Sequence, residues 1–365
     1  MRSRGFELVV EIGGRQHLAA EEIGRNRGPR LSAELECVSE VAAAAVKEAM
    51  TVLGIDVGKD FIDCEILADD KRSTKKVANS IRGFEQVVSW LRNRKVTKVH
   101  ACMEATGGFS DELAFFLHEH GHVVSIVNPM QIRAFGQSEL SRTKTDKADA
   151  ALIARFCLAM RPAPWEPPKP AERRLKQLVR RRRSLVEMRA QEENRLEAPG
   201  TENVRDSILA MIDVLGDQIQ EIEDQIKATI ESDDDLKGKR DLIESITGIG
   251  PITSSTILGE TPHIENFESS KALAAFAGVC PQLRQSGRSV SSSHKTKIGN
   301  RAIRQVLYMA AISALRTNPV VRAFGNRLRE RGKRPMQVIV AAMRKLLVLV
   351  FGVLKTRRPF DPNWA

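Results

Sequence analysis

Five short strand-like segments between residues 51 and 128 constrain the fold more than any other feature of this sequence. In chain order they read TVLGIDV, FIDCEIL, STKKVAN, KVHACME and HVVSIVN. Helical sequence follows the third at 82–93, the fourth in DELAFFLHEHG and the fifth at 146–160, which gives the order βββαβαβα. Because strands that alternate with helices form partly parallel sheets covered by those helices, residues 50–160 are predicted to form an α/β domain.

Three acidic motifs fall where the elements of this domain begin or end. GIDVGKD places Asp56 at the end of the first strand, and MEATGG places Glu104 at the end of the fourth, with neighbouring glycines that are expected to leave room for a ligand. Ligands of open α/β sheets gather beyond the carboxyl ends of the strands, so these carboxylates are expected to converge. TKTDKADA puts Asp146 and Asp149 on one face at the start of the last helix.

Each of these acids has a plainer interpretation when taken singly. An aspartate at a strand end is more often a turn residue, and acids at a helix N-terminus usually belong to a capped, solvated first turn. Four converging carboxylates would instead repel one another unless cations neutralised them. Oxygen ligands suit Mg²⁺ or Mn²⁺, and two such ions stabilise the attacking and leaving oxygens of a phosphoryl transfer.

Composition narrows the kind of partner and the compartment. A chain of 365 residues can form two or three domains, and its net charge of +11 suits a polyanion. From Arg284 to Arg358 there are eighteen lysines and arginines against one acid, Glu330, so the positive charge is concentrated near the C-terminus. The five cysteines are scattered without a CxxC pair. Neither zinc nor a disulfide framework is indicated, and a cytoplasmic protein is expected.

Changes in composition predict four segments. Residues 1–49 lack a partner for a core and are expected to be a poorly ordered N-terminal extension, followed by the α/β domain at 50–160. Residues 161–237 begin with the stiff, proline-rich spacer RPAPWEPPKP and continue as a helical middle segment. Residues 238–365 form a C-terminal domain that is expected to be mainly helical, with helix throughout 238–358.

The middle segment carries a narrow apolar seam. Its members recur at spacings of four and three residues and are Ile208, Ile212, Leu215, Ile219, Ile222 and Ile226. Such a heptad seam predicts either an antiparallel helical hairpin within 171–231 or a coiled coil that joins subunits. The run RRRR at 180–183 is either a solvated helix face or a surface that contacts RNA.

Two stretches of the C-terminal domain admit alternatives. ITGIGPITSSTIL resembles a helix-hairpin-helix, in which the turn at Gly248 and Gly250 would present backbone N–H groups to phosphates; a turn that only packs two helices is the alternative. MQVIVAAMRKLLVLVFGVL is nearly long enough to cross a bilayer. Arg344 and Lys345 lie at its middle, so we expect a buried amphipathic helix and no membrane.

In this order the motifs resemble the RuvC-like (RNase H-type) domain of transposases of the insertion sequence 110 family. That family has a DEDD carboxylate set, which maps onto Asp56, Glu104, Asp146 and Asp149. The stretch AFAGVCPQLRQSGRSVSSSHKTKIGNRAIRQVLYMAA is similar to the family's C-terminal transposase domain, whose nucleophilic serine precedes a glycine. Ser286 holds that position here.

The resemblance implies a DNA transposase or recombinase of an insertion sequence. Ser286 would cut and rejoin DNA with the help of carboxylate-bound Mg²⁺ or Mn²⁺, in a composite site to which different subunits contribute the two domains. The implied partners are donor and target DNA, a structured bridge RNA encoded beside the transposase, and further copies of the chain in a dimer or tetramer. The implied location is the bacterial cytoplasm, in association with the nucleoid.

Basic residues surround Ser286 in the sequence and suit phosphate contact. They are Arg284, Arg288, Lys295, Lys297, Arg301 and Arg304. His294 is expected to be a solvated loop residue. Two alternatives remain: a Holliday-junction-type endonuclease that acts by metal-assisted hydrolysis and leaves Ser286 idle, and a basic nucleic-acid-binding protein whose carboxylates are structural.

Overall fold

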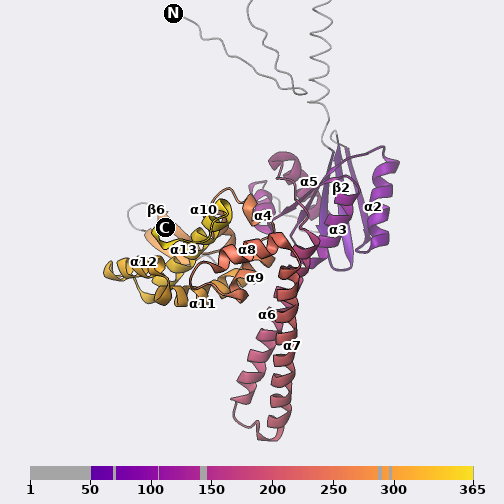
Figure 1. Cartoon of the computed structure of the whole chain (residues 1–365). Helices are drawn as coiled ribbons and strands as arrows, with labels where there is room; N and C mark the ends of the chain where they lie inside the picture. Colours follow the sequence, from indigo (N-terminus) through magenta and orange to yellow (C-terminus); the bar gives the residue numbers. More distant parts are fainter. Residues whose placement is uncertain are drawn as a thin grey trace, which may run out of the picture. The chain divides into compact units, whose positions relative to one another are not determined.

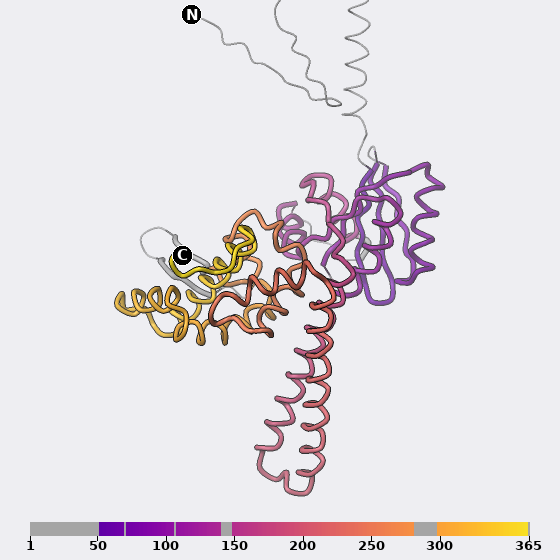
Figure 2. Tube along the Cα trace, in the orientation of Figure 1, coloured from indigo at the N-terminus to yellow at the C-terminus, as the bar shows by residue number. Residues whose placement is uncertain are grey.

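The computed structural model divides the chain into two compact units, with the boundary between Pro167 and Pro168. It describes residues 51–68, 71–105, 107–139, 146–286, 290–295 and 298–364. The expected N-terminal extension at 1–49 lies outside the described residues. Figure 2 follows the described chain from indigo to yellow, and each unit is considered separately below.

The N-terminal unit is an α/β structure with one mixed sheet of five strands. The strands are β1 (Val52–Val57), β2 (Phe61–Ala68), β3 (Lys71–Ala78), β4 (His100–Glu104) and β5 (Val123–Val127). The helices are α2 (Ile81–Asn93), α3 (Gly108–Glu119), α4 (Pro129–Ser138) and α5 (Asp146–Met160). The strand order is β3-β2-β1-β4-β5; β1, β2 and β3 pair antiparallel, whereas β4 runs parallel to both β1 and β5.

This order confirms the predicted βββαβαβα arrangement with one addition. Helix α4, which lies between β5 and α5, was not predicted from the sequence. Its N-terminus has a recognisable signal, because Asn128 caps the helix by accepting a 2.9 Å hydrogen bond from the Met130 N–H and Pro129 occupies the first turn.

Side chains of β1 and β4 alternate between two apolar cores, as the pleat of a strand requires. One core lies against α2 and α3; its strand members include Leu53, Ile55 and Met103. The other lies against α5 and joins Val52 and Cys102 to helix residues such as Ile153 and Cys157. The sheet is therefore covered on both faces, and α5 alone supplies much of the cover on the second face.

The C-terminal unit is mainly helical. Its helices are α6 (Pro170–Leu196), α7 (Arg205–Glu231), α8 (Asp234–Glu244), α9 (Pro251–Glu260), α10 (Ser270–Ala277), α11 (Arg301–Thr317), α12 (Pro319–Glu330) and α13 (Pro335–Thr356). Short 3-10 turns occur at Glu202–Val204, Ile264–Asn266 and Pro362–Trp364. Helices α6 and α7 lie side by side as a long antiparallel hairpin, visible in Figure 1.

The hairpin accounts for the heptad seam. Ile208, Leu215, Ile219 and Ile226 are buried, and Leu215 and Ile219 pack with Leu185 of α6. The chain turns back after α6 near Gly200, which has a φ of +81° that favours glycine. The folded-back alternative is therefore realised within one chain.

Two strands interrupt the helices of this unit. They are β6 (Pro281–Ser286) and β7 (Val290–Lys295), and they pair antiparallel. The prediction of helix throughout 238–358 is wrong here. The sequence PQLRQSGRSVSSSHK is polar and lacks the alternation of apolar residues by which a half-buried strand is recognised.

Two further predictions for this unit concerned the turn at Gly248 and the long apolar helix near the C-terminus. Gly248, with a φ of +103°, lies against α11, where a Cβ atom would come within 2.7 Å of the Ala314 Cβ. Thr247 O also accepts a 3.0 Å hydrogen bond from Asn318 Nδ2, so the turn serves to pack helices.

Among the described helices only α13 is long and apolar enough to cross a membrane, and its apolar face is buried in the core of this unit.

Candidate active site

Asp56 and Glu104 occupy neighbouring positions at the ends of two parallel strands. The register pairs Gly54 with Cys102 and Ile55 with Met103, and the next residue along each strand is one of the two acids. Neighbouring strands are about 4.8 Å apart, so the two backbones bring these carboxylates together. Both acids are half-buried. The predicted convergence of Asp56 and Glu104 is realised in the backbone.

Both acids also belong to the face of the sheet that α5 covers. Side chains alternate along a strand, so Glu104 shares its face with Cys102, which packs against α5. By the same rule Asp56 shares its face with Val52 and Gly54. The pair therefore faces the helix that carries the other two predicted acids.

The start of α5 lies towards these acids. Along β1, Val52 packs with residues near the middle and end of α5, and Gly54 lies beneath Ala150 and Ala154. The helix thus runs antiparallel to β1, and its first turn points towards the strand end where Asp56 lies. Asp149 in that turn is half-buried. Asp146 is the first residue of α5, as predicted, and its side chain lies outside the described residues.

The predicted ligands at Asp56, Glu104 and the start of α5 suit a hard divalent cation. They offer carboxylate oxygens, which Mg²⁺ and Mn²⁺ prefer, and no sulfur or imidazole. Among the described side chains, no group of three His, Cys, Asp or Glu is already arranged to hold a metal. Asp56 and Glu104 do have interactions within the chain. The residues fit the ion by their chemistry and their shared face.

Asn79 is a residue of this region that the sequence analysis missed. Its Nδ2 donates to Gly58 O in the turn after β1 at 2.8 Å and to Phe109 O at the start of α3 at 3.4 Å. Gly107, with a φ of +77°, turns the chain between β4 and α3. Asn79 therefore ties together the two loops that follow the strands of the acidic pair. Its only sequence signal is its place just before the capping Ser80.

Ser286 is the last residue of β6, opposite Val290 of β7. The side chains of 281–297 lie outside the described residues, so Arg284 and Lys295 are placed only by their strands, and Arg288 and Lys297 are not described. The predicted phosphate contacts around Ser286 therefore stay predictions. They differ from Arg301 and Arg304, whose side chains are described.

Arg301 and Arg304 have different environments. Arg301 is exposed, with Nη2 3.9 Å from Glu187 Oε1. Arg304 Nη1 donates to Ala277 O at 3.3 Å and to Ile298 O at 3.2 Å, on either side of the β6–β7 segment. Arg304 thus has a structural role at the base of this segment, whatever else it contacts.

The ends of the β6–β7 segment meet without space between them. A Cβ atom on Gly278 would lie 2.1 Å from Ile298 O, and one on Gly299 would lie 2.5 Å from the nitrogen of Gly278. Asn300 N–H donates to Phe276 O at 2.8 Å, and its side chain caps α11 by accepting from Ile303 N–H. The segment that carries Ser286 is therefore held at a rigid base.

An ion pair with a buried carboxylate supports that base. Glu260, with a side chain only 3 % exposed, accepts hydrogen bonds from Arg180 Nε and Nη2 at 2.9 and 3.1 Å, and from Asn300 Nδ2 at 2.9 Å. Burial alone would raise the pKa of Glu260, but the Arg180 guanidinium and the Asn300 amide hold the pKa below its usual value. Sequence analysis missed this contact, which joins residues 80 positions apart.

The basic run at 180–183 is mainly structural. Arg180 pairs with Glu260, Arg182 Nε lies 2.6 Å from Glu223 Oε1, and Arg183 Nε lies 4.0 Å from Glu187 Oε1. Three of its four arginines therefore have acidic partners in their own unit. These ion pairs favour the helix-face alternative, and contact with RNA stays a prediction.

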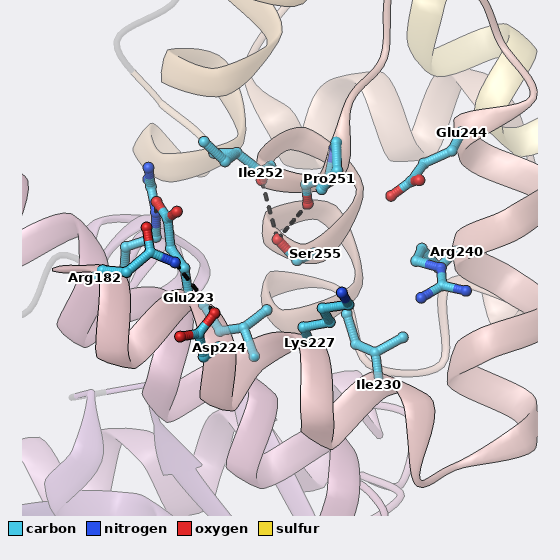
Figure 3. A pocket seen from close by; sticks show the side chains of 12 residues that line it. Arg182, Glu223, Asp224, Lys227, Ile230, Arg240, Glu244, Pro251, Ile252 and Ser255 are labelled. Carbon is cyan, nitrogen blue, oxygen red and sulfur yellow. Dashed lines mark hydrogen bonds and ion pairs between the residues drawn. The ribbon is translucent and has the colours of Figure 1, made fainter.

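A pocket of about 410 Å³ lies in the C-terminal unit among α6, α7, α8 and α9 (Figure 3). None of the predicted site residues lines it. Its polar groups are largely paired: Arg182 with Glu223, Gln220 with Asp224, and the Ser255 hydroxyl with Pro251 O at 2.6 Å. These groups are therefore engaged within the chain.

Comparisons with known proteins define the class of the molecule. A family model described as a transposase, with a DEDD-type domain, matches residues 53–199, and the model of the transposase IS116/IS110/IS902 family matches residues 240–326. These matches cover the acidic motifs and most of the C-terminal unit. The protein is thus a transposase-family enzyme that acts on DNA.

The chain belongs to the IS110/IS116/IS902 family. The pilin gene-inverting protein of Moraxella bovis is 32 % identical over 315 residues, which cover 85 % of this chain and 98 % of that protein. The transposase for insertion sequence element IS1111A of Coxiella burnetii is 29 % identical over 98 residues, or 27 % of this chain and 26 % of that protein. The resemblance to the insertion sequence 110 family is confirmed, and a purely structural, non-enzymatic role for the chain is set aside.

Among solved structures, T. thermophilus RuvC in complex with a Holliday junction substrate matches with a TM-score of 0.25 and 20 % identity. The match covers 32 % of this chain and 99 % of that chain.

Proposed function

We propose that this transposase is a recombinase that cuts and rejoins DNA through Ser286, with Asp56, Glu104, Asp146 and Asp149 as the ligands of Mg²⁺ or Mn²⁺. The observation that carries the proposal is the placement of Asp56 and Glu104 side by side on the face that the start of α5 covers. A divalent ion bound there would stabilise negative charge on the attacking and leaving oxygens.

The serine step conserves the broken linkage. The Ser286 hydroxyl loses its proton as its oxygen bonds to phosphorus, the bond from phosphorus to the 3′ oxygen breaks, and the 3′ oxygen takes up a proton. The phosphate is then held as a phosphoserine ester, which the 3′ hydroxyl of another strand attacks to restore a phosphodiester and the free serine. No external energy source is needed because one ester replaces another. Transfer of the phosphate to water would lose this linkage.

The named activity of the relatives favours rejoining over hydrolysis. A protein that inverts a gene must reconnect every strand that it cuts, and the pilin gene-inverting proteins of Moraxella bovis and Moraxella lacunata are both 32 % identical to this chain. Metal-assisted hydrolysis by the carboxylates alone, as in a junction-resolving endonuclease, would leave free ends. It is the alternative that the experiment must exclude.

Further parts of the proposal rest on the family resemblance. We propose that donor and target DNA are chosen by a bridge RNA encoded beside the gene. The active form is a dimer or tetramer in the bacterial cytoplasm, at the nucleoid, in which different subunits supply Ser286 and the carboxylates. The hairpin of α6 and α7 packs part of its heptad seam within one chain.

A plasmid recombination assay tests the proposal. The plasmid carries the gene with its native flanking DNA as donor and a separate reporter as target, and new junctions are detected by amplification. If the protein is the proposed recombinase, new junctions should form with the wild-type protein and none with Ser286→Ala or Asp56→Asn. Junctions at the wild-type rate with Ser286→Ala would overturn the role of the serine.

A further inference from the structure

Seven basic side chains lie along α12 and in the chain segments on either side of it. They are Arg316 at the end of α11, Arg322, Arg327 and Arg329 on α12, and Arg331, Lys333 and Arg334 in the turn before α13. We call this set the α12 basic surface. All seven side chains are exposed, and Glu330 is the only acid in the interval. Figure 1 shows α12 at the periphery of the C-terminal unit, beside α11 and α13.

The α12 basic surface differs from the basic residues of α6 in having no ion pairs. On α6, Arg182, Arg189 and Arg195 pair with Glu223, Glu193 and Glu192. Within the described part of the chain, by contrast, no carboxylate lies within 4 Å of any of the seven cations. Several arginines of α6 are thus neutralised within the unit, whereas the charge at α12 is not.

Helix dipoles do not explain this arrangement. Arg316, Arg327 and Arg329 lie in last turns, where a cation gains about 0.3–1 kcal/mol. Arg322 lies near the N-terminus of α12, and Arg334 is the N-cap of α13, where positive charge is disfavoured. The surface therefore accumulates like charge at some cost to the isolated protein, and an anionic partner would remove that cost.

The chemistry of the surface favours duplex DNA over other anionic partners. No large apolar side chain is exposed between Met309 and Met336, so a protein partner would find no apolar centre to bury. Phe324 is only half-exposed, and no aromatic side chain offers a platform for unpaired bases. Six of the seven residues are arginines, whose forked donors match phosphate oxygens, and the family acts on DNA.

We propose that the α12 basic surface binds the phosphate backbone of duplex DNA independently of sequence. The α12 basic surface would hold the same DNA that Ser286 and its neighbours contact. It would increase the electrostatic contribution to the affinity of the protein for DNA. The inference rests on the family's action on DNA and not on the chemistry assigned to Ser286. Arg322 and Arg329 are seven residues apart on α12, so they share one side of the helix and can face one duplex. Lys333 follows in the turn after α12.

Binding of the full-length protein to fluorescent duplexes of two unrelated sequences tests the proposal over a range of salt concentrations. The test variant combines Arg322→Gln, Arg329→Gln and Lys333→Gln. The matched control combines Arg183→Gln, Arg189→Gln and Arg195→Gln, which removes the same charge from α6, where each arginine has an acidic partner.

The test variant should bind both duplexes at least about tenfold more weakly at low salt, and its salt slope should fall by about 2–3, one per lost phosphate contact. The control should stay within about threefold of wild type. An equal loss in both variants, a loss for one sequence only, or a loss for duplex RNA with unchanged binding of duplex DNA would overturn the proposal.

A second variant separates charge from folding. Arg322→Lys combined with Arg329→Lys keeps the positive charge at both positions and should bind within about threefold of wild type, with an unchanged salt slope. If this variant loses binding as fully as the glutamine variant while its thermal unfolding matches wild type, the phosphate contacts assigned here are wrong.

Discussion

Gly54 of β1 lies directly beneath Ala150 of α5, so closely that a Cβ atom on Gly54 would be 2.2 Å from the Ala150 carbonyl oxygen. No side chain larger than hydrogen fits there. This contact fixes how closely the first turn of α5, with Asp146 and Asp149, approaches the strand that ends at Asp56.

Gly54→Ala should therefore damage the site through packing alone. The added methyl meets backbone atoms of Ala150 and Ala154, which cannot rotate away, so α5 must shift at a cost of about 1–3 kcal/mol. We expect a lower unfolding temperature and loss of recombination. The control is Gly216→Ala on α7, which meets no atom within 4 Å and should be neutral or stabilising by up to about 1 kcal/mol. Full activity of Gly54→Ala would show that α5 does not position the acids.

Asp149→Asn tests whether the acids at the start of α5 serve metal binding or folding. Removing one of several neighbouring negative charges relieves repulsion, so stability should stay within about 0.5 kcal/mol of wild type or rise, while recombination is lost. Thermal unfolding with and without Mg²⁺ measures both effects, since the stabilisation by Mg²⁺ should shrink in the variant. A large loss of stability with retained activity would favour a structural capping role.

Glu260→Gln tests the support beneath the segment that carries Ser286. The amide can still accept from one partner but leaves the Arg180 guanidinium without its negative charge, which we expect to cost about 1–3 kcal/mol because Glu260 is buried. Denaturant unfolding measures the loss. The control Glu193→Gln breaks the exposed pair with Arg189 and should cost less than about 0.5 kcal/mol. Equal effects of the two substitutions would contradict the support role.

The pH dependence of stability provides a second test of the ion pair between Arg180 and Glu260. The folded-state pKa of Glu260 lies below its usual value of 4.5, so its contribution is fully present at neutral pH and is lost as the pH falls through the lowered pKa. The difference in unfolding free energy between wild type and Glu260→Gln should thus be constant near pH 7 and shrink below about pH 4.5. A difference that grows on acidification would contradict the assigned shift.

The order of elements in the N-terminal unit could be predicted because each element carries its own local pattern. Short apolar runs marked β1 and β4, and the acidic turn at Asp146 marked the start of α5. The seam from Ile208 to Ile226 likewise predicted a helix pair. Positions of Asp56 and Glu104 followed from the general geometry of parallel strands.

Other features depend on contacts that no local pattern records. Glycines near Asp56 were expected to leave room for a ligand, but Gly54 makes room for α5. The ion pair of Arg180 and Glu260 joins two helices that are far apart in the sequence. The strands β6 and β7 have a polar sequence that lacks the apolar pattern of a half-buried strand. In each case tertiary packing decides what the residue does.

The most direct measurement of the central claim is whether cleavage leaves protein attached to DNA. The protein is incubated with Mg²⁺, the RNA transcribed beside its gene and end-labelled substrate DNA, and the products are separated under denaturing conditions with and without protease. We predict a retarded, protease-sensitive DNA species with the wild-type protein and none with Ser286→Ala. Free DNA ends of unchanged mobility, produced equally by Ser286→Ala, would contradict the account and identify a hydrolytic nuclease.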